Sequence, residues 1–145
     1  MRRIAMLLVP LLVAACLSTE DSSLSLDPTD TNVAGSFALS TINGGPLPVI
    51  ATVTTTQEFD LASDTIAIGS DGTWSEISVY TVTLLADGTK STTVTTIAGT
   101  YTIAQQQINF VQTTGGGTVS FAGSVKGTRL TVVFGGSQFI YNRST

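Results

Sequence analysis

The chain contains a single cysteine, Cys16, and no histidine. These two residue types supply most nucleophile and base pairs of hydrolytic enzymes and most ligands of zinc sites. With no histidine, and with its one cysteine close to the amino terminus, the chain lacks the usual nucleophile–base pairs and the usual zinc ligands. We therefore expect a protein that is not an enzyme and that carries no metal and no cofactor.

Carboxylates are the remaining residues that could do acid and base chemistry, because two of them suffice for glycoside hydrolysis. Glu58 and Asp60 are two residues apart and share one face of any strand, with Asp64 nearby. A cluster of this kind is more typical of a solvent-facing strand end than of a catalytic pair.

Another candidate site lies on the next long strand. Trp74, Glu76 and Tyr80 have the same parity and therefore point to one side of that strand. If this side lines a barrel, Glu76 is a carboxylate at its mouth beside two amphipathic rings, which is typical of a pocket for an apolar ligand. If Trp74 instead packs under a turn, Glu76 is merely exposed beside the Asp71-Gly72 hairpin. The first interpretation makes these three residues the predicted ligand-binding set.

The amino terminus has the pattern of an export signal. Arg2 and Arg3 precede twelve apolar residues, and small residues lead up to Cys16. Twelve residues of helix span about 18 Å, which is short of the ~30 Å hydrocarbon core of a bilayer. We predict a signal peptide at residues 1–15.

The run LVAAC, which ends at Cys16, resembles the lipobox of bacterial lipoproteins. This resemblance implies cleavage before Cys16, lipid attachment to its sulfur and anchorage in a membrane. In that family an Asp after the cysteine retains the protein at the inner membrane, so Leu17 implies an exported protein at the outer membrane. The alternative is ordinary cleavage after Ala15, which leaves a free thiol.

Two composition shifts divide the rest of the chain. Residues 16–32 are rich in Ser, Thr and Asp and have no period, so we expect the lipidated cysteine and a flexible tether there, followed by one domain at residues 33–145. The formal net charge is -4 and no cluster of Lys and Arg occurs, which argues against binding of nucleic acid.

Residues 33–145 have a β pattern throughout. Short runs rich in Thr, Val, Ile and aromatics alternate with Asn-Gly, Asp-Gly and Gly-Gly turns, and no stretch has a helical apolar face. We predict an all-β fold in which about 8–10 antiparallel strands form an up-and-down meander that closes into a barrel, with a β-sandwich as the alternative. The residues expected to face inward include Phe37, Leu39, Val49, Ala51, Val53, Ile66, Ile68, Tyr101, Ile103, Ile108, Phe110, Val119, Phe121, Leu130, Val132 and Phe134.

The segments VAGSFALSTINGGPLPV, SDGTWS, AGTYTI and FIYNR resemble small bacterial lipoproteins with a lipocalin-like barrel. In lipocalins an Arg near the end of the barrel covers a Trp on the first strand and closes one end. The resemblance assigns these positions to Arg143 and Phe37, with a cation–π contact of about 0.5–2 kcal/mol. Because Phe replaces Trp, the alternative is that Phe37 is simply core and Arg143 is a solvated terminal charge.

Two functions remain open at this point. One is a membrane-tethered envelope lipoprotein whose barrel binds a small apolar ligand, as the resemblance implies. The other is a non-catalytic structural or protein-interaction lipoprotein whose barrel core is filled, and the sequence does not identify a protein partner for it.

Overall fold

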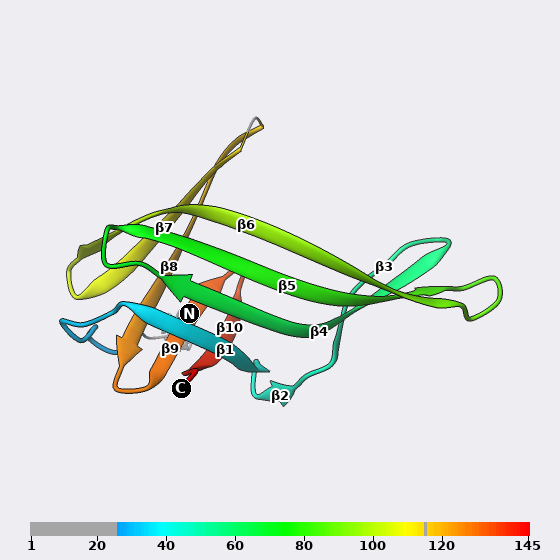
Figure 1. The fold of residues 1–145 in the computed structure, drawn as a ribbon, viewed down its shortest axis with the longest axis horizontal. Helices are drawn as coiled ribbons and strands as arrows, with labels where there is room; N and C mark the ends of the chain where they lie inside the picture. The colour runs from blue at the N-terminus through cyan, green and yellow to red at the C-terminus, as the bar shows by residue number, and fades with distance from the viewer. Residues whose placement is uncertain (1–25, 115) are drawn as a thin grey trace, which may run out of the picture.

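The fold is a barrel of antiparallel strands (Figure 1). The computed structural model describes residues 26–114 and 116–145, and these residues form ten strands and no helix. The strands are β1 (Gly35–Ile42), β2 (Gly45–Pro46), β3 (Val49–Val53), β4 (Gln57–Ile68), β5 (Thr73–Leu84), β6 (Lys90–Ala104), β7 (Gln107–Thr114), β8 (Gly117–Lys126), β9 (Arg129–Phe134) and β10 (Ser137–Arg143).

Eight of these strands close the barrel. The order β1-β10-β9-β8-β7-β6-β5-β4 returns to β1 because β4 pairs with β1 from Gly35↔Ile68 to Ala38↔Thr65. The short strand β2 is added to β1, and β3 is added to β4. Every pairing is antiparallel and most strands follow each other through hairpins. The predicted all-β, up-and-down closed barrel is therefore confirmed, and the β-sandwich alternative was wrong.

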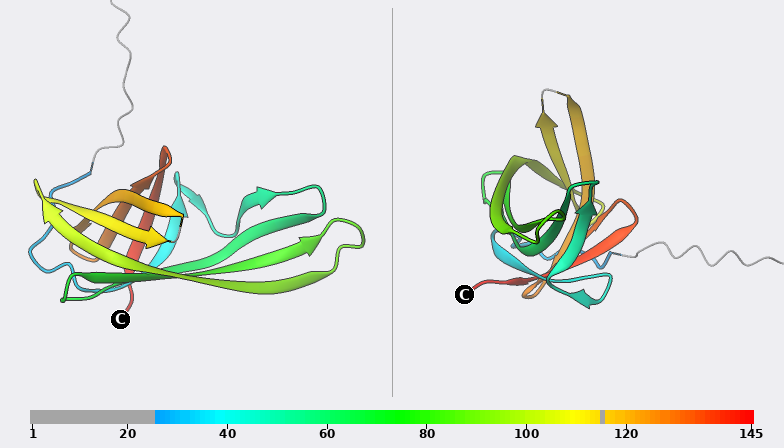
Figure 2. Two further views of the ribbon diagram at one scale, coloured as in Figure 1. Left: turned by 90° about the horizontal axis from the view of Figure 1, so that it is seen from above. Right: turned by 90° about the vertical axis from the view of Figure 1, so that its right-hand side faces the viewer.

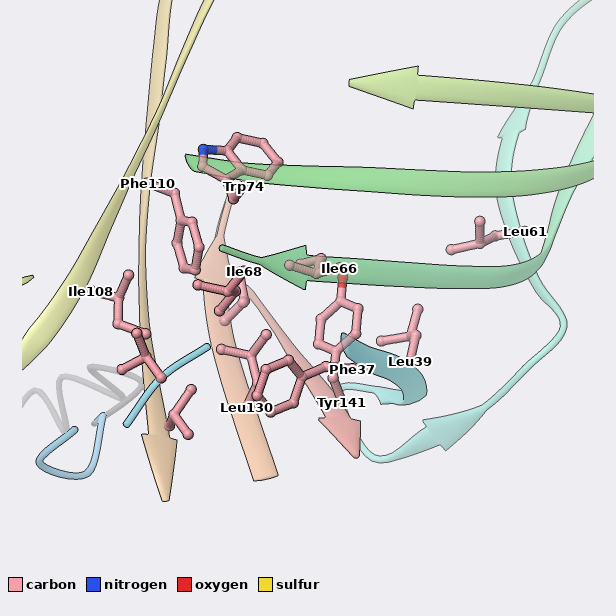
Figure 3. Packing of buried hydrophobic residues seen from close by; sticks show 13 residues of the cluster. Phe37, Leu39, Leu61, Ile66, Ile68, Trp74, Ile108, Phe110, Leu130 and Tyr141 are labelled. Atoms are coloured by element: carbon pink, nitrogen blue, oxygen red, sulfur yellow. The ribbon is translucent and has the colours of Figure 1, made fainter. Parts of the chain in front are cut away.

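The part of the barrel that contains the start of β1 and the end of β10 is solidly packed. Its side chains alternate inward from the strands, as the sequence pattern predicts for Phe37 and Leu39, and Figure 3 shows them gathered between the strands. Edge-to-face contact between Trp74 and Phe110, with ring centroids 5.6 Å apart, adds aromatic packing to this apolar burial. The cluster consists of Val33, Phe37, Leu39, Leu61, Ile66, Ile68, Trp74, Ile108, Phe110, Val125, Leu130, Val132 and Tyr141.

An arm extends beyond the barrel wall. Strands β4, β5 and β6 have 12, 12 and 15 residues, longer than the other barrel strands, and Figures 1 and 2 show them running past the rest. We call residues 49–61 and 80–96 the arm. Ala51 and Val53, which the alternation predicts to face inward, are exposed because β3 lies on this arm and not in the barrel wall.

The segment before β1 lies across one end of the barrel, which we call the closed end. The amide of Thr29 donates to the carbonyl oxygen of Gln106 at 2.7 Å, and the amide of Gly127 donates to Oδ2 of Asp30 at 2.6 Å. Residues 26–32, the last part of the predicted tether, are thus hydrogen-bonded to the turns of the barrel.

The predictions for the amino terminus concern residues outside the described part. The predicted signal peptide at 1–15, the predicted lipid attachment at Cys16 and the tether up to residue 25 all lie outside the described residues. Within residues 26–114 and 116–145, no helix is long and apolar enough to cross a membrane.

Candidate functional site: a cavity in the barrel

A β-bulge in β4 determines which carboxylate enters the barrel. Leu61 pairs with Tyr80 and Ser63 pairs with Val79, so Ala62 is an extra residue without a partner on β5. Because side chains alternate along a strand, one extra residue reverses the faces that follow it. Leu61 points inward before the bulge, and Asp64 points inward after it.

The inward orientation of Asp64 is the consequence of this bulge. Its side chain is only 5% exposed, and it lies directly opposite Ser78 on β5. The three acidic residues of this strand are thereby separated, because Glu58 and Asp60 precede the bulge and stay half-buried. Asp64, which the sequence places near Glu58 and Asp60, thus lies on the opposite face of the strand from them.

Asp64 shares its surroundings with Glu76 of the neighbouring strand. The hydroxyl oxygen of Ser78 lies 3.4 Å from Oδ2 of Asp64 and 3.3 Å from Oε1 of Glu76. A serine hydroxyl has one proton and donates one hydrogen bond at a time. Both contacts are satisfied together when one carboxyl group is protonated and donates to the Ser78 oxygen, so the geometry suits a carboxyl pair that holds one proton.

The protonation of Asp64 agrees with this geometry. Burial raises the pKa of Asp64 from 3.8 to about 8, and the neighbouring Glu76 carboxylate adds to the effect. Its hydrogen bond with Ser78 opposes the rise but does not outweigh it. The raised pKa favours the neutral, protonated form of Asp64 inside the barrel.

The carboxyl pair lies at the wall of a cavity of about 110 Å³. Val119 and Phe134, at 39% and 49% exposure, form its outer rim, whereas Asp64 and Tyr141 are buried at its base. Most of the lining is apolar, and the polar groups are few, as in pockets for small organic ligands. The lining residues are Asp64, Glu76, Ile97, Gln112, Val119, Phe121, Val132, Phe134, Phe139 and Tyr141.

Tyr141 is a permanently protonated donor at this cavity. Its burial raises the pKa of the Tyr141 phenol far above the ordinary value, and repulsion by Asp64, once it is ionised at high pH, and by Glu76 raises it further. The phenol therefore remains an O–H group at any physiological pH. One neutral donor and two carboxyl groups face the same space.

Trp74 is next to this cavity without lining it. The indole N–H donates to the carbonyl oxygens of Thr100 at 3.0 Å and Val111 at 3.3 Å. Thr100↔Val111 is the last pair between β6 and β7, and beyond it the two strands separate. Trp74 thus closes the fork between them, and its ring meets the lining residue Phe121 at 5.2 Å between centroids.

Tyr80 lines a different hollow. It borders a groove of about 400 Å³ on the arm, together with Ala51, Thr52, Phe59, Thr93 and Thr95. Of the predicted ligand-binding set, the cavity therefore contains Glu76 alone. The structure places Trp74 against the lining residue Phe121 and Tyr80 on the arm.

Arg143 lies over Phe37 at the closed end. Its guanidinium carbon is 4.6 Å from the centroid of the Phe37 ring, and Nη1 donates to the carbonyl oxygen of Ala34 at 2.5 Å. Phe37 is fully buried, so its ring is covered by the cation on one side and by core on the other. Arg143 also borders a shallow outer depression of about 730 Å³ beside residues 29–32, far from the carboxyl pair.

In the described part of the chain, no three Asp, Glu, Cys or His side chains come together as metal ligands would. No protein-family model matches the chain, and no curated protein sequence matches it either. What the cavity does must be argued from its own residues.

Proposed function

We propose that the protein is a membrane-tethered envelope lipoprotein that binds a small apolar ligand inside its barrel. The observation that carries this proposal is the cavity of about 110 Å³ lined by Ile97, Phe121, Val132 and Phe139. The cavity opens to solvent at Val119 and Phe134, so a ligand can enter it while the barrel stays folded.

The size of the cavity indicates the size of the ligand. An apolar protein cavity of about 150 Å³ accommodates benzene. The present cavity is smaller, so it suits part of a ring or a short alkyl group, and its open rim at Val119 and Phe134 lets the rest of the ligand project outward.

The tether and the cavity rim are at opposite ends of the barrel. Residues 26–32, which lead toward Cys16, lie against the turns of the closed end, as Gly127 and Asp30 show. Val119 and Phe134 are close to the turns at the other end. A lipid on Cys16, as the lipobox sequence implies, would thus hold the protein by its closed end and keep the cavity rim accessible.

The arm supports a second candidate function, a protein-interaction lipoprotein. It carries several exposed apolar side chains, among them Val94 at 59% exposure. Apolar side chains gathered on a projecting surface are typical of protein contact sites. This alternative does not need the cavity.

Toluene binding to the full chain tests the ligand proposal. Trp74 is the only tryptophan and contacts Phe121, so its fluorescence reports occupancy of the cavity. We expect saturable binding that Val119→Phe weakens by about tenfold, because the larger ring fills the rim. Val94→Phe on the arm is the matched control and leaves binding unchanged. Equal binding by both variants and the unsubstituted chain would contradict a site in the barrel.

The tethering proposal has its own test. Mass spectrometry of the protein isolated from membranes should find an amino-terminal cysteine, Cys16, with acyl groups on it. The Cys16→Ser variant should be recovered in the soluble fraction. An unmodified Cys16, or membrane retention of the variant, would contradict lipid anchorage.

A further inference from the structure

We infer that the ligand is an organic amine whose ammonium group lies against Asp64 and Glu76 while its apolar body occupies the aromatic part of the cavity. This inference rests on the proposed ligand-binding function and specifies the chemical class of the ligand. It follows from four observations on the cavity wall.

The first observation is an unused acceptor at the base of the cavity. Oδ1 of Asp64 is buried and has no hydrogen-bond partner among the described residues, although the side chain is only 5% exposed. A buried oxygen without a partner costs about 1–3 kcal/mol. A ligand N–H group that donates to this oxygen would remove that cost.

The second observation is the absence of a protein cation at the pair. The four basic residues of the described part lie elsewhere: Lys126 pairs with Asp27, Arg143 covers Phe37, and Lys90 and Arg129 are exposed. None of them lines the cavity. The negative charge of the pair is therefore not balanced by a protein cation.

The third observation concerns the amount of charge. The two contacts of the Ser78 hydroxyl fit a pair that shares one proton, so the pair carries one negative charge, which a single ammonium group balances. A carboxylic acid or phosphate ligand would add a second negative charge in a buried setting, which low-dielectric surroundings strongly disfavour. Anionic lipids and fatty acids are therefore poor ligands for this cavity.

The fourth observation is the aromatic lining, which distinguishes an organic cation from a metal ion. The rings of Phe121, Phe134 and Phe139 lie around the same space as the carboxyl pair. Aromatic faces attract organic ammonium groups and also cover an apolar body. Among the described residues, no third acidic side chain joins Asp64 and Glu76 to form a cluster of the kind that a hard metal ion prefers.

The test compares two probes of nearly equal shape. Benzylamine is a cation at pH 7, and benzyl alcohol is its neutral counterpart. We expect the full chain to bind benzylamine at least about tenfold more tightly than benzyl alcohol, as one added charge-assisted hydrogen bond would provide. Trp74 fluorescence, excited where neither probe absorbs, gives both dissociation constants.

Two variants test whether the carboxyl pair causes the preference for benzylamine over benzyl alcohol. Glu76→Gln and the double variant Asp64→Asn/Glu76→Gln keep the shape of the side chains but remove the one negative charge of the pair, and we expect each to reduce the preference for the amine to about threefold or less. Glu58→Gln, on β4 but before the bulge, is the matched control and keeps the full preference. If either cavity variant unfolds, the comparison of probes on the unsubstituted chain still decides the question.

The outcomes separate this inference from the proposed function. Equal or tighter binding of benzyl alcohol would overturn the amine assignment and leave an apolar cavity site in place. A preference for benzylamine that all three variants retain would also overturn it, because the charge would then act elsewhere. Failure of both probes and of toluene to bind would contradict the ligand-binding function itself.

Discussion

The Ser78 hydroxyl lies 3.4 Å from Oδ2 of Asp64, its direct partner across β4 and β5. This contact exists only because the bulge at Ala62 turns Asp64 into the barrel. The same hydroxyl reaches Glu76 at 3.3 Å. One serine thus joins two carboxyl groups in an otherwise apolar wall, and the behaviour of that pair can be measured.

The first prediction concerns stability and pH. Asp64 has a pKa of about 8 in the folded chain and about 3.8 when it is solvated, so between these values the folded state binds the additional proton. Its contribution to stability is complete below pH 4 and is lost as the pH rises to 8. Relative to Asp64→Asn, the unsubstituted chain should lose on the order of 2–4 kcal/mol between pH 5 and pH 8. Urea unfolding at several pH values measures this difference.

The control for this experiment is Asp60→Asn, since Asp60 lies on β4 before the bulge and outside the cavity. That variant should keep the pH dependence of the unsubstituted chain. If Asp64→Asn and the unsubstituted chain have parallel stability profiles, Asp64 is not a buried acid.

The second prediction concerns the fork between β6 and β7. Trp74→Phe removes the indole N–H and leaves the carbonyl oxygens of Thr100 and Val111 without this donor. It also leaves a void, since Trp74 is 2% exposed. We expect a loss of about 2–4 kcal/mol in the free energy of unfolding. Far-ultraviolet circular dichroism measures it, and a loss below 1 kcal/mol would contradict the role given to the indole.

The third prediction concerns Gly99, the residue of β6 opposite Trp74. A Cβ atom there would overlap the carbonyl oxygen of Val111 and lie 2.8 Å from the Trp74 nitrogen. Gly99→Ala should therefore push β6 and β7 apart and cost more than about 2 kcal/mol. Gly45→Ala, whose added atom comes no closer than 3.4 Å to the nearest atom, should cost much less. Similar thermal midpoints for the two variants would contradict this account.

The fourth prediction concerns the closed end. Arg143→Gln removes the cation above Phe37 and the hydrogen bond to Ala34, so we expect a loss of about 1–2 kcal/mol. Arg129→Gln changes an exposed arginine of β9 and should cost little. A double-mutant cycle with Phe37→Leu should give a coupling of about 0.5–2 kcal/mol between ring and cation. A coupling near zero would mean that the two groups are merely adjacent.

Strand alternation and turn residues were sufficient to predict the barrel from the sequence. They also place Glu76 on the inner face of β5, since parity fixes the side of a strand to which a residue points. Parity does not determine how far along the barrel a residue lies. A strand rises about 3.4 Å per residue, so Trp74 and Tyr80 lie ~20 Å apart along the same face and belong to different surroundings.

Asp64 could not be predicted in the same way. The bulge that turns it inward is one extra residue, and no Gly or Pro near Ala62 indicates it. The trace that it leaves in the sequence is a change of parity, because apolar Phe59 and Leu61 are followed by Ile66 and Ile68 on the other parity. A bulge between these two pairs reconciles them, and it puts Asp64 on the same face as Ile66.

The most direct test of the central claim is the place where a small apolar molecule binds. Methyl resonances of the full chain, recorded by NMR during addition of toluene, distinguish the cavity from the arm. We predict saturable shifts for Ile97, Val119 and Val132, which line the cavity, and none for Ile50 and Val94, which are exposed on the arm. Shifts confined to Ile50 and Val94, with the cavity methyl groups unchanged, would contradict a ligand site inside the barrel.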